Sequence, residues 1–174
     1  MMSRPGAAVR AGFAEQAQVV ELPYGNGAFA MTVVLPPPGT PVDDFVAALT
    51  PERWATLLGA LRDETLDVHL PRFRLAFEDE WNDVLATLGM GIAFEPGRAD
   101  FSRIAAGGGL FISVVKQNAF VEVNEEGTEA AAVTVVGIRE TSAPPSFRAD
   151  RPFVFAIRER LSGTLLFVGK VAEP

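Results

Sequence analysis

The alternation of apolar and polar residues predicts two β-hairpins, one near each end of the chain. Apolar and β-branched residues fill Ala17–Leu22 and Phe29–Leu35, and the Asn26-Gly27 pair between them is typical of a tight turn. A second pair of runs, Phe153–Arg158 and Thr164–Val168, surrounds another glycine-containing turn. We expect these four runs to form a barrel-like β-core.

Helical spacing of apolar residues occurs in three places between the hairpins. Val42–Leu49 predicts a short helix. In the next pattern Thr50 is a candidate N-cap and Pro51 the first helical residue. Trp81–Leu88 forms the third pattern, and Gly89 follows it, where a glycine can adopt the left-handed conformation that ends many helices.

Two longer segments show strand character. Leu66–Phe77 alternates with period two and is interrupted by Pro71, which predicts one long strand with a bend. Leu110–Val123 is apolar over most of its length, which predicts a strand buried on much of both faces inside a large sheet. Together with the few helices, these strands indicate an α+β fold.

Composition narrows the class of protein. With 174 residues, 48% of them hydrophobic, the chain can bury one domain-sized core. Its longest apolar runs fall far short of the roughly 20 residues that span a bilayer, so we expect no membrane partner. The first residues lack the apolar core of a signal peptide. A net charge of −7 disfavours nucleic acid as a partner.

Residues that could carry catalysis are sparse. His69 is the only histidine, and the chain has no cysteine, so neither a multi-histidine metal site nor a thiolate nucleophile is expected. Gly107-Gly108-Gly109 precedes a predicted strand rather than a helix, which argues against a phosphate cradle. The pairs Asp43-Asp44 and Glu125-Glu126 are typical of solvated surface carboxylates. We therefore predict no cofactor, no metal and no enzymatic activity.

The segment Gly127–Ser142 has conflicting propensities. Ala130-Ala131-Ala132 favours a helix, whereas Val133–Val136 favours a strand. Two interpretations follow from composition alone: a segment able to change between loop, helix and strand, or an ordinary connection between elements.

Several ordered blocks of sequence resemble the serpins, a family whose members are mostly protease inhibitors. The blocks are Glu21–Gly25, Leu70–Phe73, Leu88–Met90 with Ala93-Phe94, Ala99–Ser102, Phe120–Ala132, Ala149–Phe153 and Phe167–Val171. They span nearly the whole chain. The resemblance covers only about the C-terminal half of a serpin, so residues 1–174 are expected to form a partial serpin domain. It would contain part of the large central sheet, the barrel-like core, few helices and an exposed reactive-centre loop at about residues 125–147.

The resemblance implies a suicide mechanism. In this family an exposed loop offers a bait bond to a serine or cysteine protease. After the acyl-enzyme forms, the loop inserts as a new strand into the large sheet and carries the protease with it. Insertion needs a hinge of small residues without proline, and the corresponding hinge residues here are Gly127, Thr128, Glu129, Ala130, Ala131 and Ala132.

The position of the bait bond has two alternatives. Counting from Gly127 at the ordinary loop length of the family places the reactive bond at Thr141–Ser142, which would suit an elastase-like or subtilisin-like protease. The segment after Ser142 is short for the family, and Arg139–Glu140 is the alternative, suited to a trypsin-like protease.

The resemblance leaves other functions open. A truncated serpin fragment without inhibitory activity is one alternative, because the N-terminal half has no counterpart here, and a serpin-like binding or chaperone module is another. Without the strands of that half, the apolar edge of Leu110–Val123 favours self-association. The family implies an extracellular location, with the cytoplasm as the alternative.

Overall fold

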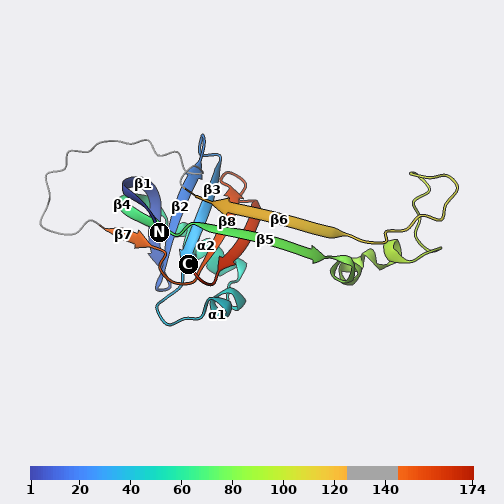
Figure 1. Ribbon diagram of the computed structural model, residues 1–174, viewed down its shortest axis with the longest axis horizontal. Helices are drawn as coiled ribbons and strands as arrows, with labels where there is room; N and C mark the ends of the chain where they lie inside the picture. The colour runs from blue at the N-terminus through green and yellow to red at the C-terminus, as the bar shows by residue number, and fades with distance from the viewer. Residues whose placement is uncertain (125–144) are drawn as a thin grey trace, which may run out of the picture. The chain divides into compact units, whose positions relative to one another are not determined.

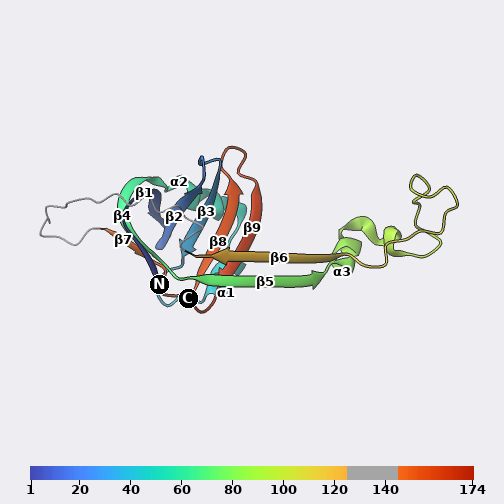
Figure 2. The same cartoon turned by 45° about the horizontal axis from the view of Figure 1, so that its top comes forward.

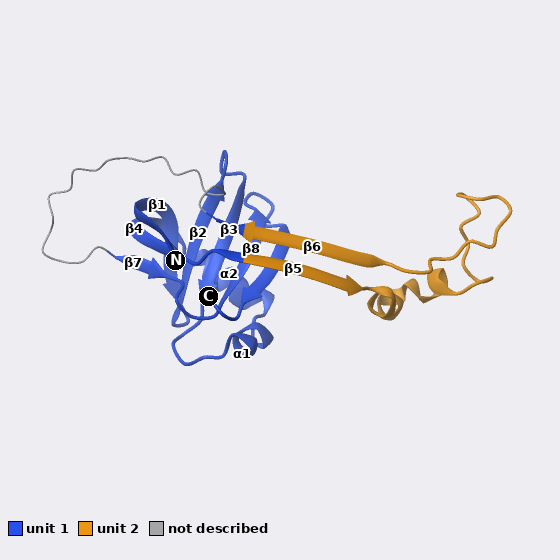
Figure 3. Cartoon of the chain, in the orientation of Figure 1, with its two compact units in different colours: residues 1–73, 123–174 blue, residues 74–122 orange. Residues whose placement is uncertain are grey.

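The computed structural model describes residues 1–124 and 145–174, and these form two compact units. Unit 1 comprises residues 1–73 and 123–174, and unit 2 comprises residues 74–122 (Figure 3).

Unit 1 is built on a seven-stranded sheet with the order β7-β4-β1-β2-β3-β8-β9 (Figure 1). All neighbouring strands are antiparallel except β7 and β4, which run parallel. The strands are β1 (Met2–Ala14), β2 (Ala17–Tyr24), β3 (Phe29–Leu35), β4 (Arg62–Leu70), β7 (Ser146–Arg148), β8 (Phe153–Glu159) and β9 (Leu165–Val171). Both predicted hairpins are confirmed, as the pairs β2–β3 and β8–β9.

The N-terminal strand β1 is irregular at Pro5 and Gly6. Its pairing with β4 shifts between Arg4 and Ala7, and Gly6 adopts a φ of 59° at this bulge. The amide of Gly6 donates to Asp67 Oδ1 at 2.8 Å, so the bulge is fixed to the neighbouring strand. This arrangement lets one strand of 13 residues pair with β4 along its length and with β2 at its C-terminal end.

Two helices in unit 1 bury their apolar sides in one core cluster with the sheet. Helix α1 (Val42–Ala47) contributes Phe45, and α2 (Pro51–Gly59) contributes Leu57, to a cluster with Val19 and Val34. The predicted N-cap is confirmed, because the Thr50 side chain accepts a hydrogen bond from the Arg53 amide at 3.3 Å.

Strands β5 (Phe73–Glu80) and β6 (Lys116–Val123) form a two-stranded sheet and run side by side (Figure 2). All their residues belong to unit 2 except Phe73 and Val123, which belong to unit 1. Between them the chain forms α3 (Asn82–Leu85), a π-helical turn (Ala86–Met90) and a 3-10 turn (Gly91–Phe94). The predicted third helix is thus present but irregular, and Gly89 has the expected positive φ, 103°.

For both long strands expected from the sequence, the predicted extent is wrong. Leu66–Phe77 is not one bent strand, because β4 and β5 belong to different sheets. In Leu110–Val123 only the part from Lys116 forms a strand, and Phe120 is 50% exposed rather than buried.

Residues 112–115, just before β6, make hydrogen bonds although they lie outside any strand. The Asn82 side chain accepts from the amide of Val115 and donates to the carbonyl of Ser113. The Ile112 amide donates to the carbonyl of Ala93, in the 3-10 turn. These contacts pair the amides of Ile112 and Val115 and the carbonyl of Ser113 with groups outside any strand, in place of a strand partner.

Among the described ranges, 1–124 and 145–174, no helix combines the length and the apolar character that a membrane span requires.

Candidate functional site

The predicted hinge, Gly127–Ala132, and both alternatives for the reactive bond, Thr141–Ser142 and Arg139–Glu140, lie outside the described residues. The structure describes the two strands that flank this segment in sequence, β6 before it and β7 after it. Ser146 and Phe147, at the predicted end of the loop, lie in strand β7.

The strand that precedes the segment carries charged and aromatic contacts with its partner β5. Lys116 Nζ lies 3.3 Å from Glu80 Oε1 and 3.7 Å from Glu78 Oε1. The Arg74 guanidinium lies 4.8 Å from the centre of the Phe120 ring, within range of a cation–π interaction. These side chains are largely exposed, so each contact contributes little to stability.

The strand that follows the segment is held by backbone pairing. β7 runs parallel to β4, with Phe147 opposite Val68 and Arg148 opposite His69. The Asp67 amide donates to the Pro145 carbonyl at 3.0 Å, and the Ala149 amide donates to the His69 carbonyl at 2.9 Å. Phe147 is 3% exposed, so the C-terminal flank is anchored in the core.

The connection from β7 to β8 is tied to the end of β3. Arg151 donates from Nε and Nη2 to the carbonyl of Pro36, at 3.2 and 3.0 Å. Ala149 and Phe153, on either side of this arginine, are fully buried. Because the connection is short and fixed at both ends, the position of β8 helps to set the position of β7.

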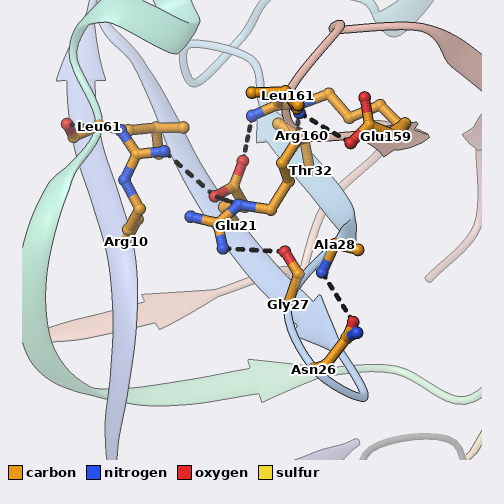
Figure 4. Close-up of polar contacts among 11 residues, drawn as sticks. Arg10, Glu21, Asn26, Gly27, Ala28, Thr32, Leu61, Glu159, Arg160 and Leu161 are labelled. Carbon is orange, nitrogen blue, oxygen red and sulfur yellow. Dashed lines mark hydrogen bonds and ion pairs between the residues drawn. The ribbon is translucent and has the colours of Figure 1, made fainter.

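A buried carboxylate on the central strand β2 is surrounded by arginines (Figure 4). Glu21 on β2 is 1% exposed and forms ion pairs with Arg158, with Arg160 at 3.1 Å and with Arg10 at 3.2 Å. Arg158 is also buried and donates from Nε to Thr32 Oγ1 on β3 at 3.2 Å. Buried charged side chains in proteins are normally paired and hydrogen-bonded, and Glu21 and Arg158 follow this rule.

Sequence reasoning missed this cluster, although a signal for it was available. Glu21 and Arg158 each interrupt an otherwise apolar strand at a position that the period-two pattern assigns to a buried face. Opposite charges on two such strands indicate a buried ion pair when the strands belong to one sheet.

The turn between β8 and β9 is held by a surface carboxylate. Glu159 accepts hydrogen bonds from the amides of Leu161 and Ser162 and from the Ser162 hydroxyl. These hydrogen bonds, those from Ser162 above all, lower the pKa of Glu159 to about 2.

Among the described residues, His69 and Asp43 do not assemble into a reaction centre, and Glu125-Glu126 lies outside the described residues. His69 is half-buried on β4, where it lies opposite Ser3 on one side and Arg148 on the other. Asp43 forms an ion pair with Lys170. The part of the chain that the structure describes contains no group of three or more histidine, cysteine or acidic side chains that could hold a metal ion.

Comparison with known proteins identifies a family that matches over the whole length. The family model described as Serpin (serine protease inhibitor) matches residues 1–174. Similar curated proteins include Serpin B13 of Homo sapiens, 37% identical over 164 residues, Serpin B8 of Bos taurus, 41% identical over 162 residues, and Antithrombin-III of Mus musculus, 39% identical over 166 residues. The alignments cover 91, 91 and 92% of this chain but 42, 43 and 36% of those relatives, so the chain spans less than half of their length.

Solved structures agree in fold. The native state of the thermophilic serpin tengpin matches with a TM-score of 0.76 and 29% identity, and native protease nexin-1 with heparin matches with a TM-score of 0.79 and 28% identity. Each match covers 99% of this chain and 46% of the other. With the family match over all 174 residues, these likenesses confirm the expected fold class, and the chain belongs to the serpin family as part of a serpin domain.

Proposed function

We propose that this chain forms part of a serine protease inhibitor and contributes the segment that the protease attacks. The observation that supports this most directly is the hinge composition in a chain of this family. Between Val123 and Pro145 the hinge Gly127–Ala132 contains no proline, and apart from Glu129 its residues are small, as insertion of the segment into a sheet requires.

The mechanism assigned to these residues has three steps. The protease nucleophile attacks the carbonyl of the reactive bond, the C–N bond breaks, and the new amine takes up a proton while the N-terminal part stays esterified to the protease. The C-terminal part remains in the sheet through β7, β8 and β9. Insertion of Ala130–Thr141 as a new strand would then carry the protease over a distance on the order of 40 Å. Each added strand hydrogen bond contributes about 1 kcal/mol net, and several together with burial of Val133 and Val135 offset the distortion of the trapped enzyme.

Incubation of the chain with trypsin, an elastase and a subtilisin tests the proposal. We expect a covalent adduct that resists denaturant, with its mass shift locating the bond. Ala132→Pro in the hinge should convert inhibition into simple cleavage, because proline blocks insertion. Ala106→Pro, in an exposed turn of unit 2, is the matched control and should leave the adduct unchanged. Cleavage without an adduct in the unaltered chain would contradict the proposal for this chain.

A second candidate function is that of a fragment without inhibitory activity, which acts as a binding module or self-associates. It is favoured by the chain spanning 46% of each solved serpin it matches. In the described residues the sheet of β5 and β6 contains no third strand, and Phe77 and Phe120 on these strands are about half exposed. Simple cleavage together with concentration-dependent oligomers in size-exclusion chromatography would support this alternative. The extracellular location stays a prediction.

A further inference from the structure

The pairing of β8 with β3 has a register that the apolar pattern alone does not fix. In the observed register Ala30 lies opposite Arg158, and Thr32 lies opposite Ala156. Along β8 the residues alternate between two faces, with Phe153, Phe155 and Ile157 on one and Val154, Ala156 and Arg158 on the other.

Displacements of β8 by one residue and by two residues have different consequences. A shift by one residue would exchange the faces and move Phe155 to the side that carries Glu21, so burial opposes it strongly. A shift by two residues keeps every side chain on its face. β3 and β8 are both almost wholly buried and apolar, so the hydrophobic pattern does not oppose such a shift.

The buried ion pair distinguishes the observed register from the two-residue shifts. A shift by two residues displaces Arg158 by about 7 Å along the strand, beyond hydrogen-bond distance of Glu21. Glu21 is 1% exposed, so losing this partner would leave its carboxylate buried with fewer donors. Thr32 would lose the hydrogen bond from Arg158 Nε at the same time.

We propose that the Glu21–Arg158 ion pair fixes the register of β8 on β3, and that it thereby positions β7, the C-terminal flank of the reactive segment. The second part rests on the proposed function, whereas the first does not. Residues 149–152 alone connect β7 to β8, and Arg151 binds the Pro36 carbonyl just after β3. A displaced β8 would therefore either strain this connection or pull β7 from its pairing with β4.

The location of the cluster supports a role in register more than a role in stability. Replacing a buried ion pair by apolar residues of similar size is often neutral for stability, whereas buried polar groups can fix the pairing of elements. Arg10 and Arg160 have side chains that are 35% and 34% exposed, so water can solvate them when the Glu21 carboxylate is replaced. Glu21→Met with Arg158→Met is therefore the informative double variant.

Engineered disulfides can report the register, because the chain contains no cysteine of its own. Phe29 and Glu159 are Cα partners in the observed register. Phe29→Cys with Glu159→Cys therefore reports this register, while Phe29→Cys with Ile157→Cys and Met31→Cys with Glu159→Cys report the two-residue shifts in the two directions. In the observed register the last two pairs are diagonal, about 7–8 Å apart, which is too far for a disulfide.

The full chain with the native ion pair should form only the Phe29–Glu159 disulfide. In the Glu21→Met, Arg158→Met background we expect at least one shifted disulfide at more than ten times its level in the native background. The matched control replaces the exposed pair of Lys170 and Asp43 by methionine and should give the native disulfide only.

Exclusive formation of the native disulfide in the apolar background would overturn the proposal. Arg158→Lys is the second variant, because it keeps a positive charge but removes the Nε hydrogen bond to Thr32. If neither variant unfolds cooperatively, the cluster contributes to folding itself, and that result also overturns the assignment to register. None of these readouts involves a protease, so failure of the proposed inhibition would leave the register test unaffected.

Discussion

Gly169 on β9 lies against the ring of Phe155 on β8. The two residues are Cα partners, and a Cβ at position 169 would stand 2.6 Å from Phe155 Cζ and 2.7 Å from Cε1. Phe155 is 1% exposed, and its ring also lies 5.3 Å from that of Phe73, centre to centre. The aromatic ring therefore occupies the space that a side chain on β9 would need.

We expect Gly169→Ala to destabilise the fold by about 1–3 kcal/mol, because the buried ring cannot move aside without leaving its rotamer. Denaturant unfolding followed by tryptophan fluorescence measures the change. Gly59→Ala is the control, since a Cβ at position 59 would meet no atom within 4 Å and alanine favours a helix. Equal stability of Gly169→Ala and the unaltered chain would contradict the close packing.

A second prediction concerns the surface carboxylate at the β8–β9 turn. The pKa of Glu159 is lowered from 4.5 to about 2 by hydrogen bonds from Ser162 and Leu161. Its contribution to stability is therefore present above pH 4.5 and is lost as the pH falls toward 2. We expect Glu159→Gln to be less stable than the unaltered chain at pH 6, and the difference to shrink as the pH falls from 4.5 to 2. A difference that is constant with pH would contradict this assignment.

The N-cap of α2 gives a third prediction. Thr50→Ala removes the acceptor of the Arg53 amide and should lower the free energy of unfolding by about 1 kcal/mol. Thr56→Ala is the matched control, because the Thr56 hydroxyl donates to the Glu52 carbonyl inside the helix, which needs no such bond. Thermal unfolding of the two variants should separate them, and equal melting temperatures would rule out a cap of this strength.

The sequence predicted the hairpins and helices because their apolar periodicity and their turn and cap residues agree. Strand β1 was not predicted, because most of its apolar residues are alanines and Pro5-Gly6 interrupts its apolar pattern. That strand owes its place to pairing with β2 and β4, which local propensity does not encode. The strand expected over Leu110–Val123 begins only at Lys116, and before it Asn82, a distant residue in the sequence, binds the Ser113 carbonyl and the Val115 amide in place of a strand partner.

In the candidate site, too, local residue types could be predicted from the sequence, whereas contacts between distant residues could not. The hinge and the bait bond are predicted from residue types and family resemblance, and they lie outside the described residues, so they stay predictions. The Glu21–Arg158 pair joins residues 137 positions apart, and only the strand order of the sheet brings them together. A single sequence shows each charge as an irregularity in a strand, whereas the structure shows that each charge is the partner of the other.

The last prediction separates the two alternatives for the reactive bond. Arg139 is the only basic residue between positions 125 and 144, so trypsin attack within this segment depends on it. If Thr141–Ser142 is the reactive bond, Arg139→Ala leaves the adduct with elastase or subtilisin unchanged, whereas Thr141→Asp abolishes it, because small, shallow pockets reject a charged side chain. If Arg139–Glu140 is the bond, trypsin forms the adduct and Arg139→Ala removes it. After cleavage the C-terminal peptide stays in the sheet through β7, β8 and β9. Intact mass spectrometry after denaturation, which separates this peptide, measures the bond directly, and a peptide that begins at neither Ser142 nor Glu140 would exclude both assignments.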